Sequence, residues 1–177
     1  MLKLLSTALL ISTVLLISTP TNAKDFTLSS SDIEEGKELD LSHVFNGFGC
    51  EGGNISPNLS WSKAPDGAKS FAITMYDPDA PTGSGWWHWT VINIASNVSS
   101  LEKSLPKGAI AVKNDFGQSS YGGACPPPGS VHRYIFSVHA LDIDKIDVPL
   151  SATNAYVRFL IHAHEISKAS ITSVYTR

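Results

Sequence analysis

Hydrophobic and polar residues alternate along much of this chain, with a period of two residues rather than 3.6. Alternation of this kind is typical of half-buried antiparallel strands, and clusters of Gly, Pro, Asn and Ser separate the alternating runs. Besides three long runs, the pattern predicts short strands at Phe26 to Ser29, Asn58 to Trp61, Ala109 to Val112 and Ser170 to Tyr175. The sequence therefore predicts a mainly β fold of antiparallel sheets.

In each of the three long runs, alternate side chains should share one face of a strand. The residues expected to share a face are Phe71, Ile73, Met75 and Asp77 in the first run, His88, Thr90, Ile92 and Ile94 in the second, and His132, Tyr134, Phe136 and Val138 in the third. Each run thus joins an apolar face to a polar, ionisable residue.

One segment near the end of the chain has helical spacing instead. Ser151 and Thr153 precede it and are both suitable N-cap residues. The positions with i, i+3, i+4 spacing are Tyr156, Phe159, Leu160, Ala163 and Ser167. We expect a short C-terminal helix that covers a sheet with this face.

The first 23 residues have the pattern of a signal peptide. Met1-Leu2-Lys3 is followed by an apolar run from Leu4 to Ile17 and then by the small residues Thr21 and Ala23. The run is short for a membrane span and contains several Ser and Thr residues. We therefore expect export to the periplasm or the exterior, and a single domain over residues 24–177 with no membrane span.

Composition and charge narrow the range of partners. The chain has 177 residues, of which 42% are hydrophobic and 16% are charged, an ordinary globular composition. Its net charge is −3, and it contains no run of Lys or Arg. Nucleic acid and acidic membrane surfaces are therefore not expected as partners.

Cys50 and Cys125 are the only cysteines. In an oxidising compartment they are expected to form a disulfide, although two buried free thiols remain the alternative. Such a bond would fix the proline-rich loop that begins at Cys125 and would stabilise the fold by roughly 4.5 kcal/mol in the chain-entropy model.

The candidate chemistry lies in two proline-stiffened loops, each of which leads into a strand with a histidine. The first loop leads from Asp77-Pro78-Asp79-Ala80-Pro81 to Trp86-Trp87-His88-Trp89, and the second from Cys125-Pro126-Pro127-Pro128-Gly129 to His132-Arg133-Tyr134. Convergence of the two loops would form a rigid pocket with imidazoles, a phenol and backbone amides.

The period of two also predicts which side chains face this pocket. His132 and Tyr134 should point to one side of their strand, whereas Arg133 should point away and have a structural or surface role. By the same rule Trp86 should share a face with His88, and Trp87 with Trp89.

Asp77 and Asp79 lie in a constrained turn, where each could either cap backbone amides or orient an imidazole. A carboxylate beside a histidine favours the protonated ring. We therefore expect the two carboxylates to hold His88 and His132 as hydrogen-bond donors to a small anion, with Tyr134 beside them. Phosphate affinity should then weaken as the pH rises through about 6 to 8.

Two other uses of these side chains are open. Asp77, Asp79, His88 and His132 could hold zinc, or they could serve a hydrolase, although no catalytic nucleophile, phosphate-binding loop or dinucleotide motif is recognisable. Neither use is preferred, so we predict no catalytic residue, no metal and no cofactor. The remaining histidines are expected to be structural or superficial: His43, His139, His162 and His164.

Four ordered motifs make the chain resemble the phosphatidylethanolamine-binding proteins, also called Raf kinase inhibitor-like proteins, and within them the bacterial YbhB/YbcL branch. They are Asn54-Ile55-Ser56-Pro57-Asn58-Leu59-Ser60-Trp61, Asp77-Pro78-Asp79-Ala80-Pro81, Trp86-Trp87-His88-Trp89-Thr90-Val91-Ile92-Asn93, and Cys125-Pro126-Pro127-Pro128-Gly129 with His132-Arg133-Tyr134.

The resemblance implies an antiparallel β-sandwich-like fold with a short C-terminal helix, and a small pocket for phosphate-bearing head groups or other anions. The residues that it places in the pocket are Asp77, Asp79, Trp86, His88, Pro127, His132 and Tyr134. The expected function is binding of phosphate, a phospholipid head group or a phosphorylated small molecule. The alternatives are a protein-interaction module that inhibits a kinase or protease or acts on a host partner, and a hydrolase that uses the Asp/His cluster.

Overall fold

The computed structural model describes residues 25–149 and 151–177, so the predicted signal peptide at residues 1–23 lies outside the described part of the chain. The elements in chain order are β1 (Thr27–Ser29), the 3-10 turn η1 (Leu41–His43), β2 (Asn46–Gly47), β3 (Cys50–Glu51), β4 (Leu59–Ser62), β5 (Ser70–Asp77), β6 (Trp86–Ala95), β7 (Ser100–Leu101), β8 (Ile110–Ala111), β9 (Val131–Leu141), α1 (Asn154–His164) and β10 (Glu165–Thr176). No helix in these ranges is both long enough and apolar enough to cross a membrane.

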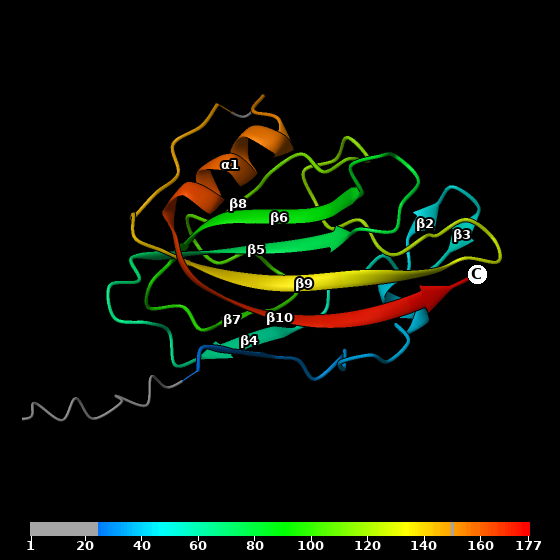
Figure 1. The fold of residues 1–177 in the computed structure, drawn as a ribbon, viewed down its shortest axis with the longest axis horizontal. Helices are drawn as coiled ribbons and strands as arrows, with labels where there is room; N and C mark the ends of the chain where they lie inside the picture. The colour runs from blue at the N-terminus through cyan, green and yellow to red at the C-terminus, as the bar shows by residue number, and fades with distance from the viewer. Residues whose placement is uncertain (1–24, 150) are drawn as a thin grey trace, which may run out of the picture.

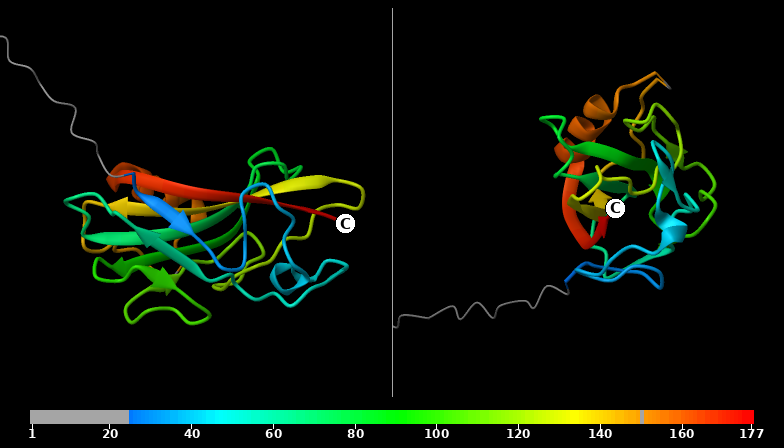
Figure 2. Two further views of the ribbon diagram at one scale, coloured as in Figure 1. Left: turned by 90° about the horizontal axis from the view of Figure 1, so that it is seen from below. Right: turned by 90° about the vertical axis from the view of Figure 1, so that its right-hand side faces the viewer.

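The strands form three antiparallel sheets. The largest has the order β10-β9-β5-β6-β8, a second has the order β1-β4-β7, and β2 pairs with β3. Figure 1 shows α1 towards one end of the large sheet and β2 and β3 at the other end, near the C-terminus. Figure 2 shows from two further directions that β9 and β10 run side by side along the molecule. The predicted mainly β, antiparallel sandwich-like fold is therefore confirmed.

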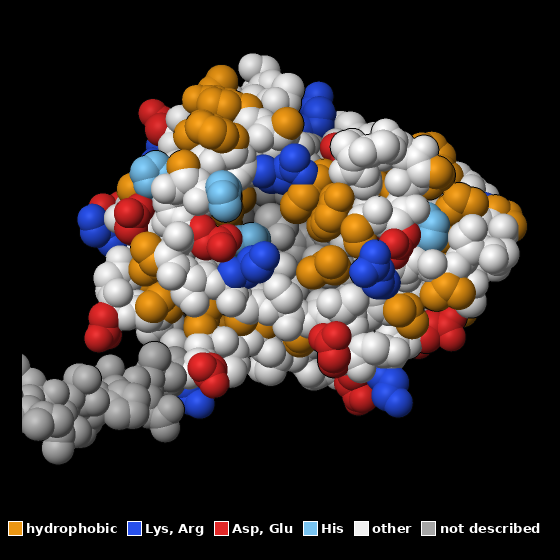
Figure 3. Space-filling view, in the orientation of Figure 1, with side chains coloured by type: hydrophobic (Ala, Val, Ile, Leu, Met, Phe, Trp, Pro, Cys, Tyr) orange, Lys and Arg blue, Asp and Glu red, His pale blue; other side chains and the backbone are white. Residues whose placement is uncertain are grey.

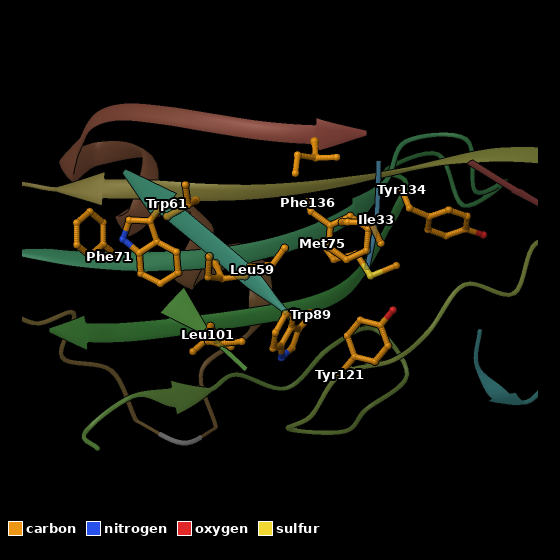
Figure 4. Close-up of a cluster of buried hydrophobic side chains, with 14 of the residues drawn as sticks. Ile33, Leu59, Trp61, Phe71, Met75, Trp89, Leu101, Tyr121, Tyr134 and Phe136 are labelled. Atoms are coloured by element: carbon orange, nitrogen blue, oxygen red, sulfur yellow. The ribbon is translucent and has the colours of Figure 1, made fainter. Parts of the chain in front are cut away.

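The main core fills the space between the large sheet and the second sheet (Figure 4). Phe71, Ile73 and Met75 of β5 contribute one row to it, as their alternation predicts. Tyr134 and Phe136 of β9 contribute another, and Figure 4 shows Tyr134 at one end of the cluster. Both rows therefore lead towards the end of the sheet where Asp77 and His132 are located.

The opposite face of the large sheet is covered by α1. Thr153 caps this helix, because its hydroxyl oxygen accepts a hydrogen bond from the amide of Tyr156. The predicted helical face is correct for Leu160, which packs against the core beneath the helix, but wrong for its aromatic residues. Val157 and Ile161 pack on the sheet, whereas Tyr156 and Phe159 are exposed.

The end of this helix also differs from the prediction. The helix ends at His164, so Ser167 belongs to β10 rather than to a helical face. β10 begins at Glu165 and pairs with β9 along its whole length, which makes it longer than the strand predicted from Ser170 to Tyr175. Pairing with a long neighbouring strand outweighs the local helical spacing here.

A β-bulge at His88 changes the order of faces along β6. Met75 lies opposite Trp89 but Tyr76 lies opposite Trp87, so His88 is the extra residue. Trp89 packs in the main core, while Trp87 stacks on Tyr76 on the helix-covered side. The prediction that Trp87 and Trp89 share a face is therefore wrong.

Beyond the bulge, the alternating residues of β6 also depart from the expected order. Thr90 donates a hydrogen bond to Asn154 of α1, and Ile92 packs in the core beneath that helix. Neither residue continues the face of His88. Ile94 returns to the main core after a second register shift, so the sequence pattern alone could not assign this strand's faces.

Candidate functional site

A pocket of about 220 Å³ lies at the end of the large sheet where β5 stops and β6 and β9 start. We call it the Asp77 pocket. Its walls are Phe48, Asp77, Ala80, Pro81, Thr82, Trp86, His88, Phe116, Cys125, Pro127 and His132. The two proline-rich loops thus converge on one pocket, as their composition suggests.

Asp77 is the centre of the hydrogen bonding in this pocket. It is only 3% exposed, and one of its carboxylate oxygens, Oδ1, accepts hydrogen bonds from the amides of Asp79 and Ala80 at 2.8 and 3.1 Å. The other oxygen, Oδ2, accepts from Nδ1 of His132 at 2.7 Å. Three donors therefore compensate the buried carboxylate, and Nε2 of His132 makes no contact with it.

His88 was expected to be protonated, but its surroundings favour the neutral ring. Its Nδ1 donates to the carbonyl oxygens of Gly122 and Gly123 at 2.9 and 3.0 Å, so its Nε2 is left with a lone pair 4.0 Å from Oδ2 of Asp77. Burial lowers the pKa of His88 to about 4, although the two carbonyls and Asp77 act against it. At neutral pH this ring is therefore a neutral acceptor, and the expectation that both histidines are protonated donors is wrong for His88.

Trp86 and Tyr134 bring donor groups to the same region. The indole N–H of Trp86 is buried and has no hydrogen-bond partner within residues 25–149 and 151–177. Tyr134 lies behind His88, with the two rings edge to face and their centroids 5.2 Å apart. Burial, with a smaller contribution from Asp77, raises the pKa of Tyr134, so its hydroxyl keeps its proton.

Asp79 forms no hydrogen bond with an imidazole among the described residues. Its carboxylate accepts three hydrogen bonds from Arg133, two from the guanidinium and one from the backbone amide, at 2.7 to 2.9 Å. The hydrogen bonds from Arg133 lower the pKa of Asp79 to about 2. The pairing of Asp79 with His88 or His132 is therefore wrong, whereas the prediction that Arg133 points away from the pocket is correct.

The mouth of the pocket is aromatic. Phe116 packs edge to face with Trp86 at a ring-centroid distance of 5.2 Å and contacts Phe48 at 5.5 Å. Phe48 is 71% exposed, an unusual position for a phenylalanine. Neither Phe48 nor Phe116 lies in an alternating run, so periodicity provided no sign of them.

The predicted disulfide is present between Cys50 and Cys125, and it forms part of the pocket wall. Arg177 covers it from outside, because Nη1 of Arg177 donates to the carbonyl oxygen of Phe48 at 3.1 Å and lies 3.4 Å from Sγ of Cys50. The backbone carbonyl of Arg177 also accepts a hydrogen bond from the amide of Gly129. These contacts hold the proline-rich loop and the Phe48 turn together.

The Asn54-Ile55-Ser56-Pro57 motif supports the pocket from behind. The side-chain oxygen of Asn54 accepts a hydrogen bond from the amide of Gly123 at 2.7 Å. A Cβ atom on Gly123 would lie only 2.4 Å from the carbonyl oxygen of His43, so only glycine fits there. This close approach places the carbonyl of Gly123 against His88.

The structure brings together five of the seven residues proposed for ligand binding. Those that line the pocket are Asp77, Trp86, His88, Pro127 and His132. Asp79 and Tyr134 do not line it. Asp79 forms an ion pair with Arg133 outside the pocket, and Tyr134 lies behind His88. The further lining residues are Phe48, Ala80, Pro81, Thr82, Phe116 and Cys125.

The alternative zinc set is not assembled. Asp79 is held by Arg133, away from Asp77, His88 and His132. Within residues 25–149 and 151–177, no three or more His, Cys, Asp or Glu side chains are grouped in a way that could hold a metal ion.

Comparison with known proteins gives consistent matches. The family model for phosphatidylethanolamine-binding protein matches residues 29–176. The UPF0098 protein YbcL of Escherichia coli K12 is 50% identical over 177 residues, with 94% of this chain and 97% of that protein covered. The crystal structure of E. coli YbcL, described as a new member of the mammalian PEBP family, superposes with a TM-score of 0.85 and covers 87% of this chain and 99% of that one.

Two further relatives extend the comparison. The UPF0098 protein YbhB of E. coli K12 is 49% identical over 156 residues, with 84% of this chain and 99% of that protein covered. A Mycobacterium tuberculosis protein named lipoprotein LppC is 34% identical over 133 residues, which are 74% of this chain and 62% of that protein. On the family model and these identities, the chain belongs to the phosphatidylethanolamine-binding protein family.

Proposed function

We propose that this chain is an exported binding protein, with one domain over residues 24–177, whose Asp77 pocket holds the phosphate of a head group or of a phosphorylated small molecule. The observation that carries the proposal is the buried pair of Asp77 and His132 beside the free Nε2 of His88. Together with the unpaired indole N–H of Trp86, this arrangement offers a donor and an acceptor within a pocket of about 220 Å³, a size suited to a single phosphate group.

The balance of charge supports a phosphate that carries a proton or an ester bond. The guanidinium of Arg133 is engaged by Asp79, that of Arg177 donates to the carbonyl of Phe48 outside the disulfide, and His88 is neutral. A fully ionised phosphate would therefore meet little positive charge and one carboxylate. A singly protonated phosphate can instead donate its hydrogen to Nε2 of His88 while one of its oxygens accepts a hydrogen bond from the unpaired indole N–H of Trp86.

The aromatic mouth supports a ligand with an apolar part next to the phosphate. Phe48, Trp86 and Phe116 surround the entrance, so carbon atoms attached to the phosphate would be removed from water there. The family's name, phosphatidylethanolamine-binding protein, points in the same direction.

Export is supported by three observations. The N-terminal sequence has the signal-peptide pattern, and Cys50 is bonded to Cys125, as is usual for proteins of oxidising compartments. The relative named lipoprotein LppC carries a name that implies export. We therefore place the protein in the periplasm or outside the cell.

The test is isothermal titration of the protein with a phosphomonoester, phosphoethanolamine, and with a phosphodiester, glycerophosphoethanolamine. The monoester loses its second proton near pH 6, whereas the diester has no proton to lose in this range. If His88 accepts a proton from the ligand, affinity for the monoester falls as the pH rises through about 6 to 8, and affinity for the diester stays level.

His132→Gln should remove binding of both ligands, while His164→Gln, a histidine substitution at a partly exposed ion pair with Asp142, should leave it intact. Equal loss of affinity for both ligands with rising pH would instead support the expectation from the sequence that His88 and His132 are protonated donors to the anion. Absence of binding by either ligand would overturn the proposal and favour a protein partner, and turnover of the monoester would favour the hydrolase.

A further inference from the structure

A second pocket, of about 330 Å³, lies on the other face of the large sheet, beneath α1. We call it the Arg158 pocket. It is lined by Thr74, Trp87, His139, Arg158, Ile161, His162, Glu165 and Lys168. It shares no lining residue with the Asp77 pocket. In Figure 3, cationic, acidic and imidazole side chains surround a hollow on this face, below the position that α1 has in Figure 1.

The wall of this pocket contains a stacked aromatic platform. The guanidinium of Arg158 lies over the ring of Trp87, 3.9 Å from its centroid, and Trp87 stacks on Tyr76 at 4.2 Å. Stacking fixes the plane of the guanidinium, so the N–H groups at its edge are held ready for a planar or tetrahedral anion.

Arg158 nevertheless has no carboxylate partner. None of the ion pairs within residues 25–149 and 151–177 includes it, and its Nε is buried without a hydrogen bond. The indole N–H of Trp87, on the same platform, is likewise buried and unpaired in this part of the chain. Buried donors without acceptors are rare in native proteins, and two of them in one stacked pair indicate that an acceptor from outside completes the site.

The other charges around the pocket do not supply that acceptor. Glu165, the single carboxylate in the lining, forms an ion pair with Nδ1 of His139, whose Nε2 bonds to Thr74 at 2.9 Å. Lys168 stands on the rim without an ion-pair partner in the described ranges, and His162 lies one helical turn from Arg158. Asp115, outside the lining, also acts on Arg158, but its carboxylate accepts a hydrogen bond from the amide of Trp87 at 2.7 Å and forms no ion pair with Arg158. Two permanent cations thus face two carboxylates that are both engaged elsewhere.

We propose that the Arg158 pocket is a second ligand site that binds a small oxyanion, a phosphate or a carboxylate, between Arg158 and Lys168. The anion would accept hydrogen bonds from the guanidinium edge and from the ammonium group, with His162 at the rim. Its size and its floor of buried Thr74 and His139 suit a small molecule rather than a protein segment.

The indole N–H signals in a ¹⁵N–¹H correlation spectrum can separate the two pockets, because Trp86 lines one and Trp87 lines the other. The full-length mature protein is titrated with inorganic phosphate and, separately, with citrate, at ionic strength matched with sodium chloride. We expect the Trp87 signal to shift and saturate with at least one of the two anions. Response to phosphate alone or to citrate alone identifies the preferred oxyanion.

Lys168→Gln should raise the dissociation constant obtained from the Trp87 shift by about tenfold, since it removes one charge-assisted hydrogen bond. Lys145→Gln, which changes an exposed lysine paired with Asp147, is the matched control and should have no effect. Because Lys168 is exposed, the variant should fold normally. Arg158→Lys keeps the charge but loses the fork and the stacking, and should also weaken binding.

The same titrations are repeated with His132→Gln, which on the proposed function should no longer bind an anion in the Asp77 pocket. A Trp87 signal that does not move with either anion would overturn the proposal, whatever Trp86 does. So would a Trp87 shift that disappears in His132→Gln, because the anion would then be acting from the Asp77 pocket. A Trp86 signal that does not respond in the unsubstituted protein bears on the proposed function alone and leaves the Arg158 site standing.

Discussion

The Asp77 pocket and the Arg158 pocket lie on opposite faces of the same sheet, yet their charges are arranged in opposite ways. In the Asp77 pocket the ionised group is buried and fully hydrogen-bonded, and the neighbouring His88 is neutral. In the Arg158 pocket the cations form no ion pair with a carboxylate among the described residues, and Glu165, the one acid in the lining, is engaged by His139. The first site is suited to recognise the shape and the proton of its ligand, and the second is suited to recognise charge.

The two sites also differ in how they are held. The Asp77 pocket is built from strand ends and two loops and is fixed by a disulfide, whereas the Arg158 pocket is built from a helix and strands. The protein therefore offers a direct way to disturb one site and keep the other.

The largest effect is expected from removal of the disulfide. Replacing both Cys50 and Cys125 by Ser should lower the free energy of unfolding by about 4.5 kcal/mol, because the unfolded chain regains the freedom of a long loop. Urea unfolding measures this loss. In the folded variant the Trp86 indole signal should move and the Trp87 signal should stay, and equal changes in both would contradict the separate support of the two sites.

A somewhat smaller effect is expected from Asp77→Ala. The substitution leaves Nδ1 of His132 and two backbone amides without their acceptor in a buried position, at a cost of about 3 kcal/mol in unfolding free energy. Urea unfolding again provides the measurement. Asp77→Asn is the control, since it keeps an oxygen for the amides and should lose much less, and an equal loss would show that charge rather than hydrogen bonding stabilises this site.

The neutral state of His88 gives a prediction about pH. Its pKa is about 4 in the folded protein, against 6.5 for an ordinary imidazole in the unfolded chain, so the unfolded chain takes up the proton first as the pH falls. Stability is unaffected above about pH 6.5 and decreases towards pH 4, by about 3 kcal/mol in total. His88→Asn, which keeps a donor for Gly122, should remove most of this slope in unfolding experiments at several pH values. His164→Asn should keep the slope.

The smallest of these effects concerns the helix of the Arg158 pocket. Thr153→Ala removes the N-cap of α1 and should lower the unfolding free energy by about 1 kcal/mol. Urea unfolding measures this difference as well. Ser151→Ala, at the other cap position suggested by the sequence, should be close to neutral. If Ser151→Ala proves the more damaging, the helix begins earlier than the hydrogen bonds of Thr153 indicate.

Periodicity predicted the mainly β antiparallel fold, the resemblance implied its sandwich-like form, and the only cysteine pair predicted the disulfide. The pairing of Asp77 with a histidine was predicted because a carboxylate beside an imidazole orients it. The sequence could not predict the protonation state of His88, which depends on the bulge and on the carbonyls of Gly122 and Gly123. Phe116 was missed because an irregular segment has no period.

Arg158 was missed for a different reason. The apolar spacing of Tyr156 and Phe159 indicated the wrong helical face, and so the residue that stacks on Trp87 was not recognised as part of a site. Aromatic residues on the exposed side of a short helix can thus outweigh Val157 and Ile161 in a sequence pattern, even though the latter two form the contact with the sheet.

The position of Arg177 has a practical consequence for experiments with this protein. Its side chain donates to the carbonyl of Phe48 and its backbone bonds to Gly129, so any residues joined after Arg177 emerge beside the mouth of the Asp77 pocket. A purification tag or reporter fused at that end would compete with a ligand for the entrance. Fusions are better placed ahead of β1, and binding data from proteins tagged at the other end should be compared with data from the tag-free form.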